Sequence, residues 1–297
     1  MINEREKVSK KVAWIALISN IILMVGKIVF GLVGDSEAVF ADGIHSAADV
    51  VASMTVLAVV GISNKPPDKD HPFGHGKAEV ISEAIVGIIL LLVSLYIFVE
   101  AILSFIGEPS APQYSALVVA LISYISKEIL YRYSFKQGQK WNSKAILAIA
   151  FDHKGDIFAS VAAFIGVLLA ILGKSYGWFY LLYADPVASI LVAYLILKIA
   201  FELLKPSVDV LMEKSVAPEL LNEYIAIING FDQVRRIDKI RAREHGHYKL
   251  IDVRISLDFD LTIKQGHDVA REIRNTIKSN YSDIREVLIH VNPYFAE

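Results

Sequence analysis

Residues 80–106 read VISEAIVGIILLLVSLYIFVEAILSFI, and this stretch decides the fold class. A helix needs about 20 mostly apolar residues to cross the hydrocarbon core of a bilayer, which is about 30 Å thick. Five further runs of this kind lie at 12–33, 38–61, 112–133, 144–172 and 179–204. The sequence therefore predicts an all-α, six-helix transmembrane bundle over residues 12–205, embedded in a lipid bilayer.

The composition indicates a membrane domain followed by a soluble one. The chain is 54% hydrophobic and 21% charged, whereas soluble domains are about 45–50% apolar and about 25% charged. The apolar excess lies in residues 12–205, and residues 206–297 have the composition of a soluble domain. A net charge of −2 gives no basic footprint for nucleic acid. The absence of cysteine excludes thiol catalysis, disulfides and thiolate zinc sites.

Lysine and arginine predict the orientation, because cytoplasmic loops carry an excess of both. Basic residues gather in the N-terminal tail, after the second and fourth spans, and after the sixth: Arg5, Lys7, Lys10, Lys11, Lys65, Lys69, Lys77, Arg132, Lys136, Lys140, Lys144 and Lys205. The opposite loops hold only Lys174. Both termini are therefore expected in the cytosol. Residues 1–11 are expected to form a cytosolic tail, since no small-residue cleavage site follows a short apolar core.

The second and fifth predicted spans carry acidic residues and histidine, which are costly at membrane depth and usually mark a function. Asp42, His45 and Asp49 are spaced i, i+3 and i+7, on one helical face. In the fifth span Asp152 and Asp156 are spaced i and i+4, and His153 precedes Asp156 by three residues. The two segments also resemble each other, because DVVAS at 49–53 matches DIFAS at 156–160 and places His45 opposite Asp152.

Two helices that each offer an i, i+4 pair can place four ligands around one point. Nitrogen and oxygen donors in that number suit a small divalent cation. The predicted metal ligands are His45, Asp49, Asp152 and Asp156, with Asp42 and His153 as weaker candidates outside this set. The alternatives are that the carboxylates share a proton, or that they pair with Lys27 or Lys154.

A second candidate site lies in the loop after the second span. Asp68, His71 and His75 are spaced 3 and 4 residues apart, and Pro72, Gly74 and Gly76 shape the turn between them. Asp70 is a competing ligand. A solvated surface loop is the alternative interpretation.

Several of these motifs together resemble the cation diffusion facilitators. The resemblance rests on six spans, the His-x-x-x-Asp and Asp-x-x-x-Asp pairs, FGHGKAE at 73–79 and IHVNP at 289–293, and it runs essentially from end to end. It implies a homodimeric antiporter that exports divalent metal from the cytosol in exchange for protons. It also implies a transport site at His45, Asp49, Asp152 and Asp156, and a loop site at Asp68, His71 and His75. Lys77 would join a charge interlock between protomers, with Glu213 as its candidate partner.

One departure from the zinc-transporting members concerns the metal. Those members usually have histidine where this chain has Asp152, so the site becomes one imidazole and three carboxylates. Oxygen-rich sites suit harder ions such as Mn²⁺, whereas imidazole suits zinc and copper. The chain thus resembles the manganese and iron branch, and Mn²⁺ is the favoured substrate, with Zn²⁺, Fe²⁺ and Co²⁺ as alternatives. No organic cofactor is expected, and the expected location is a bacterial cell membrane.

Residues 206–297 are predicted to form an α+β dimerisation and regulatory domain. Helical patterns near 217–229 and 266–280 and strand patterns near 234–244, 248–258 and 285–291 give the order αββαβ, interpreted as ferredoxin-like. Val253, Ile255, Leu257 and Phe259 alternate with polar residues, as in a half-buried strand.

Related domains bind metal between protomers, but several of the corresponding ligand residues are replaced in this chain. Arg254 and Asn292 stand where histidine and aspartate ligands would be expected, while His267, His290 and Asp238 remain as weak candidates. His245 and His247 are additional and are placed at a turn.

Two other classes of function compete with a carrier. An intramembrane metallohydrolase needs an activated water and a general base, but the sequence has no His-Glu-x-x-His and no Gly-x-Ser-x-Gly. A membrane metal sensor would signal through residues 206–297 without flux. The interpretation adopted is a secondary transporter, not an enzyme.

Overall fold

The computed structural model describes residues 2–107, 111–141 and 143–295, so part of the connection between the third and fourth predicted spans and the first residue of the predicted tail lie outside the described residues. The chain divides into two compact units. The first comprises Met1–Thr55 and Ile85–Leu204, and the second comprises Val56–Ala84 and Lys205–Glu297. Three long helices have residues in both units.

The first unit is built from helices. They are α1 (Ile2–Val33), α2 (Glu37–Ser63), α3 (Lys77–Ile106), α4 (Tyr114–Lys140), α5 (Lys144–Tyr176), the short 3₁₀ helix η1 (Phe179–Tyr183) and α6 (Ala184–Leu211). Five segments among the described residues are long and apolar enough to cross a membrane: Lys7–Val33, Lys77–Ile106, Tyr114–Lys140, Ala145–Tyr176 and Phe179–Leu211. The sixth predicted span, along α2, stays a prediction.

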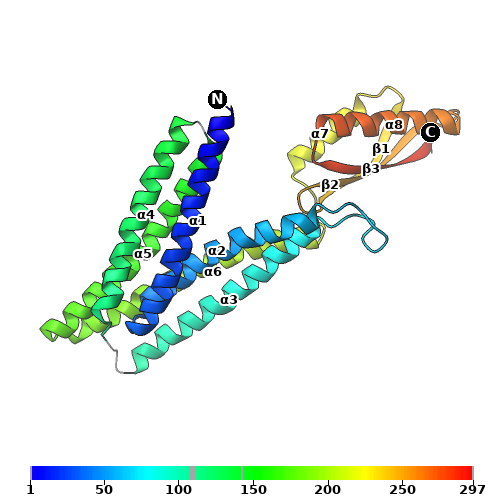
Figure 1. Ribbon diagram of the computed structural model, residues 1–297. Coiled ribbons are helices and arrows are strands. Elements are labelled where there is room, and N and C mark those ends of the chain that lie inside the picture. Colours follow the sequence, from blue (N-terminus) through cyan, green and yellow to red (C-terminus); the bar gives the residue numbers. More distant parts are fainter. Residues whose placement is uncertain (1, 108–110, 142, 296–297) are drawn as a thin grey trace. The chain divides into compact units, whose positions relative to one another are not determined.

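Small residues hold these helices together. Buried Ala41, Ala48, Ala159 and Ala193 belong to one apolar cluster that joins α2, α3, α5 and α6, and α1, α4 and α5 run side by side (Figure 1). Small side chains let helix backbones approach closely. At Gly43 of α2, an added Cβ would lie 2.9 Å from the backbone nitrogen of Ile28 in α1. This close approach brings the polar residues of α2 within reach of α1.

Large apolar side chains cover the outside of the helices. They include Trp14, Ile22, Leu32, Leu92, Leu103, Ile129, Phe158 and Leu191, each about half exposed or more. A helix that is hydrophobic all round is typical of a membrane span. The outward apolar surface therefore fits a lipid environment.

The C-terminal part of the second unit has the predicted αββαβ order. Its elements are α7 (Pro218–Asn229), β1 (Val234–Glu244), β2 (Lys249–Asp258), α8 (Ile263–Asn280) and β3 (Ile284–Tyr294). The sheet order is β1-β2-β3, with β1 antiparallel and β3 parallel to the central strand β2. The element order is thus confirmed, while the ferredoxin-like assignment stays a prediction.

The core of this domain lies between β2 and the two helices. Val253, Ile255 and Leu257 are buried against residues such as Ile273 and Tyr224. The expectation for Phe259 is wrong, because β2 ends at Asp258 and the Phe259 side chain is 64% exposed. Helix α8 also begins three residues earlier than predicted, since Thr262 and Gln265 form a capping box at its start.

Candidate metal centre

Three of the four predicted transport ligands meet inside the first unit. Each of His45, Asp49 and Asp156 offers one ligand atom, and these atoms lie within 4.8 Å of one another. His45 and Asp156 are buried, and His45 Nε2 lies 3.4 Å from Asp156 Oδ1. The i, i+4 spacing places both α2 residues on one face. One imidazole and two carboxylates from two helices therefore form a group of ligands that could hold a divalent cation.

Asp152 lies outside this group. It precedes Asp156 by one turn of α5, but its side chain is exposed, and it is not among the residues whose ligand atoms come together. The structure thus assembles three of the four predicted ligands.

Asp42 pairs with a buried lysine and does not belong to the three-residue group. Its Oδ2 lies 2.8 Å from Lys27 Nζ and accepts a hydrogen bond from Ser160 Oγ at 2.9 Å. Lys27 is fully buried and also donates to Ser46 and Ser160, at 3.0 and 3.2 Å. Lys27 therefore pairs with Asp42, and their opposite charges compensate each other.

His153 is buried next to Asp156. Its Nδ1 lies 3.8 Å from Asp156 Oδ2, and neither ring nitrogen has a hydrogen-bond partner among the described residues. It is placed to contact Asp156, and it does not join the three-residue group.

The sequence reasoning missed Lys127. This residue lies on α4, is fully buried, and places Nζ 2.5 Å from Asp156 Oδ2 and 2.9 Å from Asn20 Oδ1 of α1. The available signal was a lysine within the predicted span 112–133, where a buried charge requires a partner. Asn20 itself, half-buried in α1, completes this contact.

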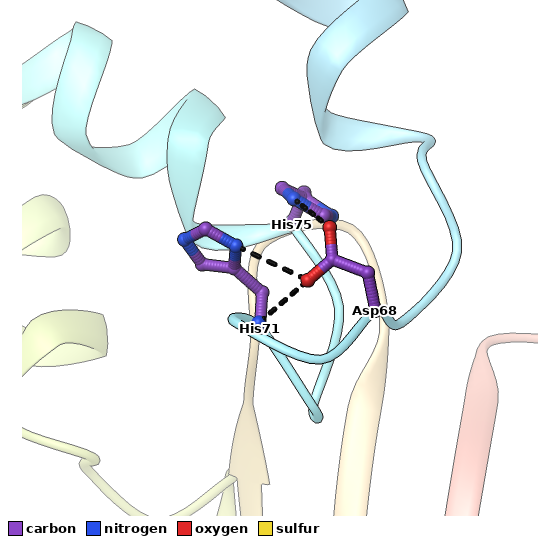
Figure 2. A group of neighbouring side chains, drawn as sticks. All are labelled: Asp68, His71 and His75. Atoms are coloured by element: carbon purple, nitrogen blue, oxygen red, sulfur yellow. Dashed lines mark hydrogen bonds and ion pairs between the residues drawn. The ribbon is translucent and has the colours of Figure 1, made fainter.

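The loop candidates lie together in the second unit, as Figure 2 shows. Asp68 Oδ1 accepts a hydrogen bond from the backbone amide of His71 at 2.7 Å and lies 3.4 Å from His71 Nδ1. Asp68 Oδ2 lies 3.3 Å from His75 Nε2. The backbone amide of His71 holds the pKa of the Asp68 carboxyl below its usual value. The loop thus presents an ionised carboxylate and two imidazoles, while the competing candidate Asp70 contributes a backbone amide to Asp68.

The loop is fastened to the C-terminal domain within the same unit. The Tyr248 hydroxyl donates to the carbonyl of Phe73 at 2.7 Å and accepts from the amide of Gly76 at 3.3 Å. Gly74 has φ +90°, a conformation that favours glycine. Lys77 Nζ lies 3.2 Å from Glu213 Oε1. The predicted charge partners therefore meet within one chain.

The weak candidates of the C-terminal domain do not assemble into a metal site. His267 and His290 are exposed and line one pocket with Asn292, but neither belongs to a three-ligand group among the described residues. Asp238 accepts hydrogen bonds from Asn292, Ser256 and Arg236. The Asn292 amide is the main cause of its lowered pKa. The Asp238 carboxylate therefore forms hydrogen bonds within the sheet.

The remaining histidines lie at the turn before β2, where they were expected. His245 is buried and stacks on Tyr248 with 5.2 Å between ring centroids. Burial lowers its pKa. His247 Nδ1 lies 3.7 Å from Glu79 Oε2. Both residues thus contribute to the contact between the loop region and the domain.

Comparisons with known proteins match the two parts of the chain separately. A family model described as the cation efflux transmembrane domain matches residues 13–212. A second, described as the cytoplasmic domain of cation efflux proteins, matches residues 216–294.

Similar proteins extend along nearly the whole chain. The manganese efflux system protein MneP of Bacillus subtilis (strain 168) is 77% identical over 297 residues, with 100% of each chain covered. The magnetosome protein MamB of Paramagnetospirillum magneticum is 34% identical over 285 residues, covering 96% of this chain and 94% of that one. The manganese efflux system protein MneS of Bacillus subtilis is 32% identical over 282 residues, covering 95% and 94%.

Proposed function

This chain belongs to the cation efflux family, and from that premise we propose that it exports divalent metal ions, manganese foremost, from the cytosol. The resemblance to cation diffusion facilitators is confirmed by the two family matches over residues 13–212 and 216–294. Two similar proteins, one of them 77% identical, are named as manganese efflux proteins. In this proposal the chain acts as a secondary transporter and not as an enzyme.

The buried group of His45, Asp49 and Asp156 is the single observation that carries the proposal. Buried acidic residues and histidine on two apolar helices are costly, and a shared cation compensates for that cost. Asp152 joins as a fourth ligand when α5 turns its exposed face inward, and His153 and Asp42 stay outside the ligand set.

Oxygen ligands favour manganese over zinc. With Asp152 the site has three carboxylates and one imidazole, and carboxylate ligands suit Mn²⁺ better than imidazole does. Zn²⁺ nevertheless outbinds Mn²⁺ at most sites of this kind, so geometry and the metals present in the cytosol also set the selectivity. Zn²⁺, Fe²⁺ and Co²⁺ remain alternative substrates.

Proton exchange would drive the export. Metal binding needs deprotonated ligands, so protonation weakens it. Protons that arrive from outside would expel the ion and recharge the site, while rocking of the helices exposes it alternately to each side. In this proposal α2 crosses the bilayer as a sixth span, both termini face the cytosol, and the chain lies in the bacterial cell membrane.

The remaining parts serve the transport unit. The loop group of Asp68, His71 and His75 binds a second ion on the cytosolic side. Residues 206–297, a ferredoxin-like domain in this proposal, pair two protomers into a homodimer, with His267 and His290 available for weak metal contacts. The tail 1–11, the transport domain 12–205 and the domain 206–297 are the proposed divisions.

Manganese-driven flux in proteoliposomes tests the proposal. Purified chain is reconstituted, and Mn²⁺ uptake and the accompanying proton movement are recorded for the native sequence, Asp49→Ala and Asp156→Ala. The expected result is uptake by the native chain and its loss in both variants. Binding without flux would favour a metal sensor, and undiminished flux in the variants would contradict the site.

A further inference from the structure

One of the three candidate metal ligands is in direct contact with an ammonium from a third helix. Lys127 of α4 is fully buried, and its Nζ lies 2.5 Å from Asp156 Oδ2. Its second contact is the side-chain oxygen of Asn20 in α1, at 2.9 Å. The ammonium thus spans α1, α4 and α5, and Asp156 is its only carboxylate partner among the ion pairs of the described residues.

The two oxygens of Asp156 have different neighbours. Oδ1 faces His45 Nε2 at 3.4 Å, on the side of the three-ligand group. Oδ2 faces Lys127 Nζ. An ion among His45, Asp49 and Asp156 is therefore offered Oδ1, while Lys127 holds Oδ2. Only one carboxylate group would separate the lysine charge from the bound ion.

This arrangement acts oppositely on the empty and the loaded site. In the empty site, Lys127 compensates a buried carboxylate that would otherwise be costly. In the loaded site, a positive charge stands close to a divalent cation in a medium of low dielectric, and the repulsion between them is strong. Both effects shift the equilibrium toward release of the ion.

We propose that Lys127 is a positioning residue of the transport site: it holds Asp156 Oδ2 and serves as a built-in counter-cation that weakens metal binding enough for the ion to leave. This inference rests on the proposed transport of divalent metal. It gives Lys127 a role distinct from that of Lys27, which is also fully buried and whose charge is compensated by Asp42 and two serines.

The measurement is the Mn²⁺ dissociation constant of the purified full chain in detergent, by titration calorimetry at fixed pH and salt. Lys127→Met removes the charge and keeps an apolar chain of similar length. We expect it to bind Mn²⁺ at least about tenfold more tightly than the native chain, because the repulsion is lost. Lys127→Arg keeps the charge, and its affinity should stay within about threefold of the native value, a shift that falls well short of the full charge effect. General damage to the fold would weaken binding, so the direction of the change separates the two explanations.

A matched control removes the other buried pair. The double variant Lys27→Met with Asp42→Asn loses one positive and one negative charge together, and its Mn²⁺ affinity should change by less than about threefold, because a neutral pair is lost. The variant Asn20→Asp is a second test of the inference, and it retains Lys127. Its new carboxylate competes for the ammonium, so this variant should also bind Mn²⁺ more tightly, and it serves as the test if Lys127→Met does not elute as a folded species.

The outcomes separate the inference from the proposed function. If the native chain binds Mn²⁺ and Asp49→Ala abolishes that binding, the transport site stands. Unchanged or weaker binding in Lys127→Met, or in Asn20→Asp when it is the test, then overturns the role of Lys127 alone. If the native chain binds no Mn²⁺ at this site, the proposed function itself fails.

Discussion

Lys77 Nζ lies 3.2 Å from Glu213 Oε1, so an ion pair joins the first residue of α3 to the segment that follows α6. Glu213 has a left-handed backbone, with φ +58°, which is uncommon for a residue with a side chain. Its second carboxylate oxygen lies 3.6 Å from Arg243 Nε of β1. One acidic side chain thus connects three segments of the second unit.

The Lys77–Glu213 pair should contribute modestly to stability at neutral pH. The two side chains are 24% and 51% exposed, and exposed pairs contribute about 0.2–1 kcal/mol. A double-mutant cycle of Lys77→Ala and Glu213→Ala, read from thermal unfolding in detergent, should give a coupling energy in that range at pH 7.

Acid should remove this coupling. The hydrogen bond from Lys77 lowers the pKa of Glu213, so the stabilisation is present above the pKa of the unfolded chain and is lost as pH falls through the folded value. Repeating the cycle at progressively lower pH should therefore show a decreasing coupling energy. A coupling that grows on acidification would contradict this assignment.

Replacing Tyr224 with phenylalanine should leave the C-terminal domain as stable or more stable. Tyr224 is fully buried, its ring meets Tyr281 edge-on at 5.0 Å, and its hydroxyl has no partner among the described residues. Removing an unsatisfied buried hydroxyl while keeping the ring should gain up to about 1 kcal/mol. Chemical unfolding of the native chain and Tyr224→Phe measures the difference.

The same substitution should alter the response to alkali. Burial raises the pKa of Tyr224 to about 12, whereas tyrosine in an unfolded chain ionises near pH 10, at about its reference value. The native domain should therefore lose stability as pH rises from about 10 to about 12, and Tyr224→Phe should lose less. Identical alkaline profiles would rule out this contribution.

The loop group should bind its own ion independently of the buried site. Asp68 lies between both imidazoles (Figure 2), so Asp68→Ala removes the shared anionic ligand. Equilibrium dialysis against Zn²⁺ should show one fewer ion per chain for this variant, because imidazole and carboxylate together suit zinc. Asp70→Ala is the matched control and should bind as the native chain does, since Asp70 contributes only its backbone amide.

Asp152→His should move selectivity toward zinc. The substitution exchanges a carboxylate for an imidazole beside the buried group, and imidazole favours Zn²⁺ relative to Mn²⁺. Competition uptake into proteoliposomes should show a higher ratio of Zn²⁺ to Mn²⁺ than the native chain. An unchanged ratio would place Asp152 outside the transport site, in agreement with its exposed position.

Hydropathy predicted the helices well because each apolar run lies mostly within a helix. It missed several of the helix ends. Helix α1 begins at Ile2 and α4 continues to Lys140, since charged residues remain helical where the helix leaves the apolar region. Phe259 followed the strand pattern and yet lies beyond β2. Apolar periodicity does not reveal where backbone pairing stops.

The candidate site was predictable to the extent that it depends on spacing along single helices. His45 and Asp49 of α2 come together with Asp156 of α5, while the second predicted α5 ligand, Asp152, does not join them. Which carboxylate pairs with which lysine depends on how separate helices pack, and no spacing within one helix contains that information. The pairing of Lys27 with Asp42 and of Lys127 with Asp156 became visible only in three dimensions.

The position of bound manganese tests the account most directly. Crystals of the full chain grown with Mn²⁺, measured at the manganese absorption edge, would give an anomalous difference map. The account predicts a peak within bonding distance of His45, Asp49 and Asp156 in the native chain, and no peak there in Asp49→Ala. Manganese bound only at the loop or the C-terminal domain, with no peak at these three residues, would contradict the proposed transport site.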